Sequence, residues 1–432
     1  MRRYDSYKDS GVEWIGEVPS HWKVLRLKFA YIFKTGATPS SGKKEYYGGD
    51  YKWANIGDLT SKYVDDTAKH ITKEAISSCS MTINPIGTLM YSFKLSVGTV
   101  AFCSDEMYSN EAIASFIPQK NNLDYLYYAA PVFIIHNSNR NIYNAPILNQ
   151  DLIKNAIICL CPKYEQEQIA SYLNSKCGEI DKVISTQEKR IALLQELKQS
   201  IITNAVTKGL NPDVKMKDSG IEWIGEVPEH WEICKIKHIG KIHGRVGYRG
   251  YTTADLVQEG EGALTIGGKH ISKCTLDLSD AEYISWSKYY ESPEIMVTKG
   301  DILIAQRGSL GKSALIKEDI GEATINPSLV LLNSIKFNPT FLHYILLSDS
   351  VITTICLLNT STAVPMITQN QIANIMIPKC HLTEQQEIAS YLDKRCASID
   401  ASISKAQREI ELLQEYKQSL ITEVVTGKRK VC

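Results

Sequence analysis

Residues 165–181 read EQEQIASYLNSKCGEID, and residues 384–400 read EQQEIASYLDKRCASID. The likeness continues along LLQELKQSIIT (193–203) and LLQEYKQSLIT (412–422). Over the aligned stretches 164–207 and 383–426, 24 of 44 positions are identical. Neither copy contains proline, and apolar residues recur at heptad spacing, which predicts a long helix that needs a helical partner. The sequence therefore predicts two helices, each roughly 60 Å long, that pair with each other.

The expected seam between these helices contains polar residues as well as apolar ones. Gln187 and Lys198 occupy heptad positions in the first copy, and Lys417 occupies one in the second. Polar residues at such positions more often set the register and the choice of partner in a coiled coil than take part in chemistry. We therefore expect these three side chains to hold the helices in one register.

A second duplication precedes each long helix. Residues 8–22 (KDSGVEWIGEVPSHW) match residues 217–231 (KDSGIEWIGEVPEHW) at 13 of 15 positions. The tryptophans, isoleucine and valine of this motif predict a packing clamp, and its Gly and Pro predict turns. None of its side chains belongs to a reactive set. The chain is therefore a tandem duplication, in which short motif, variable region and long helix follow one another twice.

The two variable regions differ in sequence but share landmarks in the same order. IGTLMYSFKLSVG (86–98) corresponds to KGDILIAQRGSLG (299–311), and NAPILNQDLI (144–153) corresponds to TAVPMITQNQI (362–372). Short alternating apolar runs separated by Gly and Asn predict mixed sheets with turns, together with a helix at 124–135. One scaffold with two different surfaces is the pattern expected of two copies of a reading head that read different things.

These patterns predict a mixed α+β (α/β) fold with a pseudo-two-fold axis, in which two long antiparallel helices form a coiled coil and separate two globular heads. The predicted segments are 1–22 (N-terminal conserved segment), 23–162 (first head), 163–207 (first spacer helix), 208–231 (linker and repeated conserved segment), 232–380 (second head) and 381–432 (second spacer helix and C-terminal tail).

Composition limits the class of protein. Of 432 residues, 44% are apolar and 22% are charged, as in an ordinary folded protein, and the formal net charge is zero. Zero net charge argues mildly against a nucleic-acid partner without excluding one, because the local distribution of charge matters more. The 11 scattered cysteines fit free thiols, the polar start is unlike a signal peptide, and no apolar run is long enough to span a membrane. The expected location is the cytoplasm.

The sequence contains no recognisable catalytic motif. It lacks GxGxxG, GxxxxGKS/T, HExxH and GxSxG, and its nine histidines are dispersed without metal-ligand spacing. We therefore predict no catalytic, cofactor-binding or metal-binding residues in this chain.

Basic and aromatic residues cluster in the loops of both heads. Lys and Arg can neutralise phosphates, and Arg, Asn and Gln can make bidentate contacts with base edges. Loop charges are usually only solvated surface, but recurrence in both halves, on loops carried by a scaffold, favours DNA binding. The candidate DNA-binding residues are Lys43, Lys44, Tyr46, Tyr47, Lys52, Trp53, Lys94, Asn139, Arg140, Asn141 and Tyr143 in the first head, and Arg245, Tyr248, Arg249, Tyr251, Lys269, His270, Gln306, Arg307 and Lys312 in the second.

With these features assembled, the chain resembles the specificity subunit of type I restriction-modification systems over essentially its whole length. The resemblance is carried by the motifs WIGEVPSHW (14–22) and WIGEVPEHW (223–231), by the helix segments quoted above, and by GDILIAQRGSLGK (300–312) and GRVGYRGYT (244–252). One departure is that IGTLMYSFKLSVG lacks the Asp and Arg of its counterpart, which leaves Lys94 as the candidate contact there.

The resemblance implies two target-recognition domains, each reading one half of a bipartite double-stranded DNA site. It also implies that two methyltransferase subunits dock on the repeated helices and motifs, and that a restriction (motor-nuclease) subunit joins them. Those partners would use S-adenosylmethionine, ATP and Mg²⁺, so no cofactor is expected in this chain.

Two other functions stay open at this point. One is a structural coiled-coil adaptor whose two heads bind proteins. The other is a fused enzyme with an unrecognised active site. The DNA-reading function predicts a split methylated motif that depends on this chain, whereas the other two functions do not.

Overall fold

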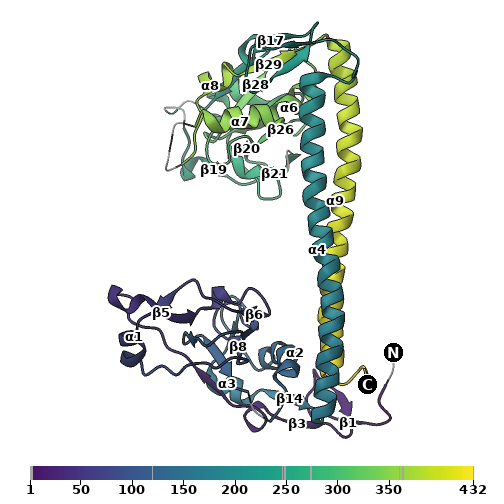
Figure 1. Ribbon diagram of the computed structural model, residues 1–432. Helices are drawn as coiled ribbons and strands as arrows, with labels where there is room; N and C mark the ends of the chain where they lie inside the picture. Colours follow the sequence, from purple (N-terminus) through teal and green to yellow (C-terminus); the bar gives the residue numbers. More distant parts are fainter. Residues whose placement is uncertain are drawn as a thin grey trace. The chain divides into compact units, whose positions relative to one another are not determined.

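The computed structural model describes residues 3–118, 120–245, 247, 250–272, 275–359, 361 and 364–431, which form two compact units. The first unit is Met1–Gln187 with Arg408–Cys432, and the second is Glu188–Gln407. The long helices α4 (Lys163–Lys208) and α9 (Leu382–Val425) each contribute one half to each unit. Each unit therefore consists of a head and one half of the helix pair, as the labels in Figure 1 show.

The first head is built on an antiparallel sheet in the order β4-β11-β8-β9, to which β6 adds in parallel. Every residue of the central strands β8 and β11 is buried, which explains their near-continuous apolar sequences. The strands are β1 (Tyr7–Asp9), β2 (Glu17–Pro19), β3 (Lys23–Arg26), β4 (Phe33–Thr35), β5 (Tyr47–Ala54), β6 (Tyr63–Val64), β7 (His70–Ile71), β8 (Leu89–Ser92), β9 (Val100–Cys103), β10 (Tyr108–Ser109), β11 (Ile113–Phe116), β12 (Asn139–Arg140), β13 (Pro146–Ile147) and β14 (Ile157–Leu160), and the helices are α1 (Lys73–Ser78), α2 (Leu123–Ile135) and α3 (Gln150–Asn155).

The second head repeats this core with the order β18-β28-β25-β26, and it adds a separate five-stranded sheet. The prediction of one scaffold used twice is thereby confirmed. The strands are β15 (Met216–Asp218), β16 (Glu226–Pro228), β17 (Glu232–Lys235), β18 (Lys241–Gly244), β19 (Leu256–Val257), β20 (Gly262–Ile266), β21 (Ile271–Ser272), β22 (Thr275–Leu276), β23 (Glu282–Ser285), β24 (Met296–Val297), β25 (Ile302–Ala305), β26 (Ser313–Leu315), β27 (Ala323–Ile325), β28 (Leu329–Asn333) and β29 (Met376–Lys379), and the helices are α5 (Trp286–Tyr290), α6 (Pro339–Leu346), α7 (Asp349–Leu357) and α8 (Gln369–Ala373).

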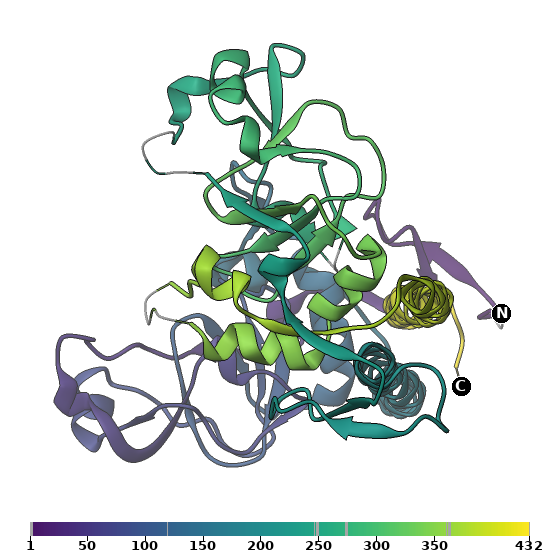
Figure 2. The same cartoon turned by 90° about the horizontal axis from the view of Figure 1, so that it is seen from above.

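In each unit the two long helices run side by side and antiparallel, as predicted, and Figure 2 views them end-on. In the first unit Lys417 Nζ lies 2.6 Å from a carboxylate oxygen of Asp181. In the second unit Lys198 Nζ lies 2.7 Å from Asp400, at the equivalent positions of the repeat. Gln187 also donates to Glu409 at 3.0 Å. These polar pairs fix one register, since sliding either helix by a turn would separate all three.

The repeated Glu-Gln at the start of each long helix ties the helix to its head. In the first unit Trp22 Nε1 donates to Glu165 at 2.9 Å, and Gln166 accepts from the backbone of Asn122 at 2.9 Å while it donates to the Cys161 carbonyl at 2.8 Å. Glu165 and Gln166 are almost fully buried, so each needs these partners. We call Trp22, Glu165, Gln166 and Asn122 the clasp of the first unit.

The second unit has the same clasp. Trp231 donates to Glu384 at 3.0 Å, and Gln385 accepts from the backbone of Asn338 at 2.8 Å. Asn122 and Asn338 also act as N-caps, accepting from the third residue of α2 and of α6 respectively. The clamp predicted from the duplicated motif therefore packs on the long helix through a buried hydrogen bond as well as through apolar contacts.

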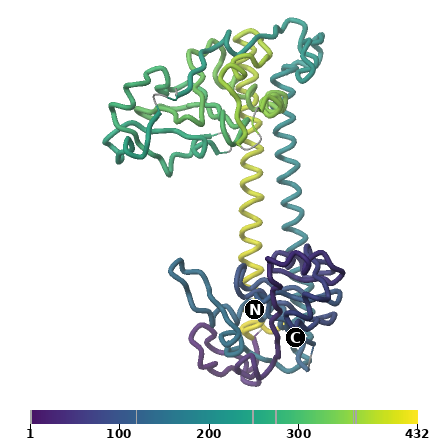
Figure 3. The backbone as a smooth tube through the Cα atoms, turned by 90° about the vertical axis from the view of Figure 1, so that its left-hand side faces the viewer, coloured from purple at the N-terminus to yellow at the C-terminus, as the bar shows by residue number. Residues whose placement is uncertain are grey.

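Both chain ends lie in the first unit (Figure 3), where the last turn of α9 joins the core of the first head. Tyr7 donates to the carbonyl of Gly427 at 3.2 Å, and Tyr125 donates to that of Val425 at 3.3 Å. Gly427 has a φ of +74°, and a Cβ there would lie 2.3 Å from Cδ of Pro19. Only glycine fits this helix end without a local shift.

We expect Gly427→Ala to lower the free energy of unfolding by about 1–3 kcal/mol, because it adds both a left-handed backbone strain and a clash. Gly178→Ala is the matched control: Gly178 lies within α4, a Cβ there would meet nothing within 4 Å, and the second copy carries Ala397. The control should stabilise by about 0.5–1 kcal/mol. Denaturant unfolding measures both, and equal stabilities would contradict the expected strain at Gly427.

Within the described residues, no single helix is long and apolar enough to cross a membrane. The pair α6 and α7, bent by 57° at the break between them, reaches that limit together by length and composition alone.

Candidate nucleic-acid interface

The hairpin between β8 and β9 displays one of the predicted contacts of the first head. Lys94 is exposed on its turn, and its ammonium group lies 3.4 Å from the Glu111 carboxylate. Exposed pairs of this kind contribute little to stability, so a phosphate can compete for the lysine at small cost. The structure therefore leaves Lys94 available for DNA.

A second group of predicted residues lies on the loop before β5 and on β5 itself. Lys43 is exposed and sits 5.0 Å from the centre of the Tyr46 ring, as in a cation–π contact. Lys44 is also exposed, whereas Tyr47 is half-buried and donates to the Pro39 carbonyl. Lys52 is paired with Asp105 at 2.7 Å, and this hydrogen bond raises its pKa.

The stretch that follows α2 contains a short hairpin of β12 and β13. The predicted residues Asn139, Arg140, Asn141 and Tyr143 are all exposed on it. Ile142 was not predicted as a contact, yet its side chain is 91% exposed. Composition could not reveal this, because an isolated isoleucine ordinarily predicts burial.

In the second head the matching hairpin between β25 and β26 carries Gln306, Arg307 and Lys312. Gln306 is half-buried and donates to the Pro327 carbonyl at 2.9 Å. Arg307 and Lys312 are exposed, and neither forms an ion pair with any residue in the described part of the chain. Two free cations on a structurally equivalent hairpin make this the second head's counterpart of Lys94.

Three predicted contacts are buried, and the prediction is corrected for them. Trp53 is 3% exposed and donates to the Ala37 carbonyl at 3.1 Å. Arg245 is 5% exposed and donates to the Ile325 carbonyl and the Thr324 hydroxyl, both at 3.0 Å. His270 is 1% exposed, and its Nδ1 accepts from the backbone of Gly267. These side chains shape the loops from within instead of meeting a ligand.

The remaining predicted residues of the second head fall into two groups. Tyr251 is half-buried with its ring 5.3 Å from the Arg245 guanidinium, and Lys269 is exposed but paired with Asp280 and Glu282. The ion pairs raise the pKa of Lys269. Tyr248 and Arg249 lie outside the described residues.

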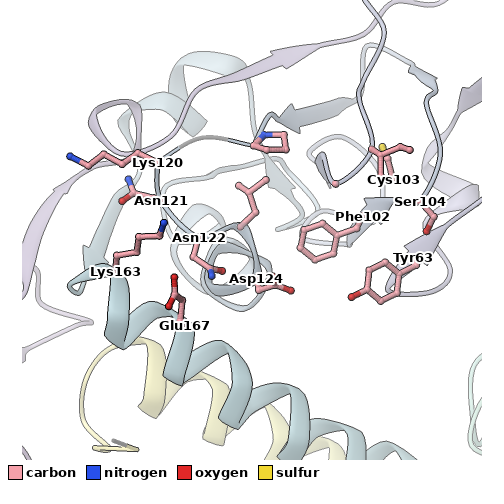
Figure 4. A pocket seen from close by; sticks show the side chains of 14 residues that line it. Tyr63, Phe102, Cys103, Ser104, Lys120, Asn121, Asn122, Asp124, Lys163 and Glu167 are labelled. Carbon is pink, nitrogen blue, oxygen red and sulfur yellow. The ribbon is translucent and has the colours of Figure 1, made fainter.

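An open pocket of about 570 Å³ lies in the first unit beside the start of α4 (Figure 4). Lys120, Lys163 and Glu167 stand on one side of it, and Tyr63 and Phe102 stand on the other. It also contains Cys103, but burial raises the pKa of this thiol to about 12, so the thiol stays protonated at neutral pH. The pocket offers no activated nucleophile.

Metal and thiol chemistry find no further support in the described residues. No group of three or more His, Cys, Asp or Glu side chains there is placed to hold a metal ion, and the cysteines described are all free. What the two heads share is instead an equivalent, cation-bearing hairpin, which joins the third and fourth strands of the four-strand order common to both heads.

Comparisons with known proteins match both halves of the duplication. The family model of the type I restriction modification DNA specificity domain matches residues 19–195 and 228–412. The MjaVIII specificity subunit of Methanocaldococcus jannaschii is 26% identical over 96% of this chain and 94% of its own length. The EcoBI specificity subunit of Escherichia coli is 23% identical over 79% of this chain and 75% of its own.

Among solved structures, a chain from a study of complex assembly and conformational transition in a type I restriction-modification system has a TM-score of 0.71. It is 15% identical, and the match covers 94% of this chain and 98% of that one, so the two folds are alike. Because the family model matches both halves of the duplication, the chain belongs to the family of type I restriction-modification DNA specificity proteins.

Proposed function

We propose that this chain is the address-reading subunit of a type I restriction-modification complex and that each head reads one half of a bipartite DNA target. The single observation that supports this best is the repeated sheet order in the two heads combined with different side chains on equivalent hairpins. A shared scaffold gives both heads the same approach to a duplex. Different loop chemistry gives each head its own base preference.

The equivalent hairpins suit direct contact with DNA. The first head presents Lys94 and the second presents Arg307 and Lys312, all exposed. Lysine meets phosphate as a point charge, whereas arginine can grip guanine in the major groove through two hydrogen bonds. The heads therefore differ in the kind of contact that the same hairpin can make.

The long helices would dock two copies of one partner, which we identify as the methyltransferase subunit. Leu193 is 64% exposed and its repeat-equivalent Leu412 is 49% exposed, while Leu197 (47%) corresponds to Tyr416 (51%). Apolar residues left on the surface at equivalent positions of both repeats suit two like interfaces. We infer that these partners bring the S-adenosylmethionine chemistry and that a restriction subunit brings the ATP- and Mg²⁺-dependent steps. Because the proposed ligand is genomic DNA, we infer that the protein is located in the cytoplasm.

Methylome sequencing tests the proposal. A host lacking other methylation should be given the cognate methyltransferase subunit alone, this chain alone, or both. We expect a split adenine motif of two short half-sites around a fixed spacer only when both are present. A motif that persists without this chain would contradict the proposal. Co-purification of the complex without any methylated motif would favour the adaptor function instead.

A further inference from the structure

The tip of the β12–β13 hairpin carries two large side chains that are almost fully exposed. Ile142 is 91% exposed and Tyr143 is 82% exposed, and they are adjacent in sequence. Neither side chain packs against an apolar core cluster of the first unit. Single exposed apolar residues are common, but an exposed aliphatic-aromatic pair at the apex of a turn has no packing role in the free protein.

The turn that carries them is held rigidly by hydrogen bonds. The side-chain oxygen of Asn141 accepts from the backbone of Tyr143 and from that of Ala145, each at 2.9 Å. Arg140 donates to the carbonyl of Asn144 at 2.9 Å, and the backbone of Asn144 bonds to Asn141 at 2.9 Å. The tip is therefore a preformed projection, which loses little conformational freedom when it binds.

The surroundings of the tip favour nucleic acid over protein as its ligand. The stretch 137–150 contains Arg140 and no Asp or Glu, and six of its residues are Asn or Gln. Within this stretch no carboxylate would repel a phosphate, although Asp151 follows it directly, and the amides offer donors and acceptors that match base edges. A tip of this kind, apolar at its apex and polar at its base, resembles the side-chain wedges that enter a minor groove and part a base step.

We propose that Ile142 and Tyr143 form a wedge that opens one base step within the half-site read by the first head. This rests on the proposed function, since it assumes that the first head binds duplex DNA. At the offset of 219 residues that relates the two long helices, the corresponding positions in the second copy are Ser361 and Thr362, which lack the bulk of a wedge. The opening is therefore confined to one half-site, and it adds sequence dependence through the ease with which that step unstacks.

The test uses the complex of this chain with its methyltransferase subunits and duplexes that carry the methylated motif. 2-Aminopurine, which brightens when it unstacks, is placed in turn at each position of the first head's half-site. We expect a rise in fluorescence at one step other than the methylated adenine, because that adenine is itself expected to leave the stack.

Three paired variants distinguish a wedge from a tip that binds protein or acts through its hydroxyl group. Ile142→Ser with Tyr143→Ser should abolish the rise and weaken binding about tenfold or more, with an unchanged salt slope because no cation is lost. The double variant Ile142→Leu with Tyr143→Phe should preserve both the rise in fluorescence and the binding affinity. The control is Phe29→Ala with Ile32→Ala, which removes another exposed aromatic-isoleucine pair (75% and 62% exposed) from the same head. This control should leave the fluorescence rise and the binding affinity unchanged.

The wedge is overturned if the double serine variant keeps the affinity and the fluorescence of the wild type. It is also overturned if that variant loses its methyltransferase subunits while the control retains them, since the tip would then bind protein. A Leu/Phe variant as defective as the serine variant would point to the Tyr143 hydroxyl instead. If the wild-type complex shows a half-site preference without any rise, only the wedge fails. If it shows no preference, the proposed function fails.

Discussion

Exchanging residues 23–162 for the same region of another family member is expected to change one half-site and to leave the other half-site intact. The first head is joined to α4 by the clasp, of which Trp22, Glu165 and Gln166 lie outside the exchanged segment. Asn122 contributes only its backbone N–H to the buried Gln166, so any donor residue except proline keeps this hydrogen bond, whose loss would cost about 1–3 kcal/mol. A donor without proline at that position should fold onto the resident helices.

The effect on specificity should be large. Each mismatched base pair costs about 1–3 kcal/mol, so a half-site with three altered positions would be discriminated by several orders of magnitude. Methylome sequencing of the chimera reads the outcome, and the reciprocal exchange of 232–380 is its matched control. A single exchange that altered both half-sites would contradict the assignment of one head to one half.

Removing one heptad from both long helices is expected to shorten the spacer between half-sites without changing either half-site. Asp181 lies opposite Lys417 and Lys198 lies opposite Asp400, so in this register 187–193 faces 405–411. Deleting both segments spares both ion pairs and turns each helix by only about 20° relative to its old face. The helices lose roughly 10 Å, which corresponds to up to about three base pairs.

Deleting 187–193 alone is the control, because it leaves seven residues of α9 without a partner and should lower the unfolding temperature. The matched deletion should fold and methylate a motif with a shorter spacer. A matched variant that folded, methylated DNA and kept the original spacer would show that the helices do not set the distance.

The long helices and the duplication could be predicted from the sequence. Heptad spacing of apolar residues indicates the helices, and the repeated segments indicate the duplication. The two long helices span Lys163–Lys208 and Leu382–Val425, so each begins and ends within a residue or two of its repeated segment. Lys198 and Lys417 form the ion pairs that set the register, as expected. The clasp was not predicted. Its partners are distant in sequence, and nothing local indicates that Glu165 receives the Trp22 indole.

The candidate DNA contacts were predicted less well, because composition does not say which way a loop residue faces. Arg245 and His270 looked like free loop cations, but both are buried and hydrogen-bonded to their own head. Conversely, Ile142 was not among the predicted contacts, yet it is exposed. The charged residues in the sequence indicate which loops can bind DNA. Whether each side chain is exposed or buried depends on tertiary contacts, which the sequence does not show.

The chain's two units differ in when they can be completed during synthesis. The second unit is continuous from Glu188 to Gln407, whereas the first needs the last residues of α9. Leu420, Val424 and Val425 belong to the same apolar core as Trp22 and Tyr125. At about 5–20 residues per second, the ribosome takes roughly 10–40 s to add the intervening residues. The first head is synthesised first, but part of its apolar core therefore stays exposed until the end of α9 has been made. The second head can complete its fold before the first.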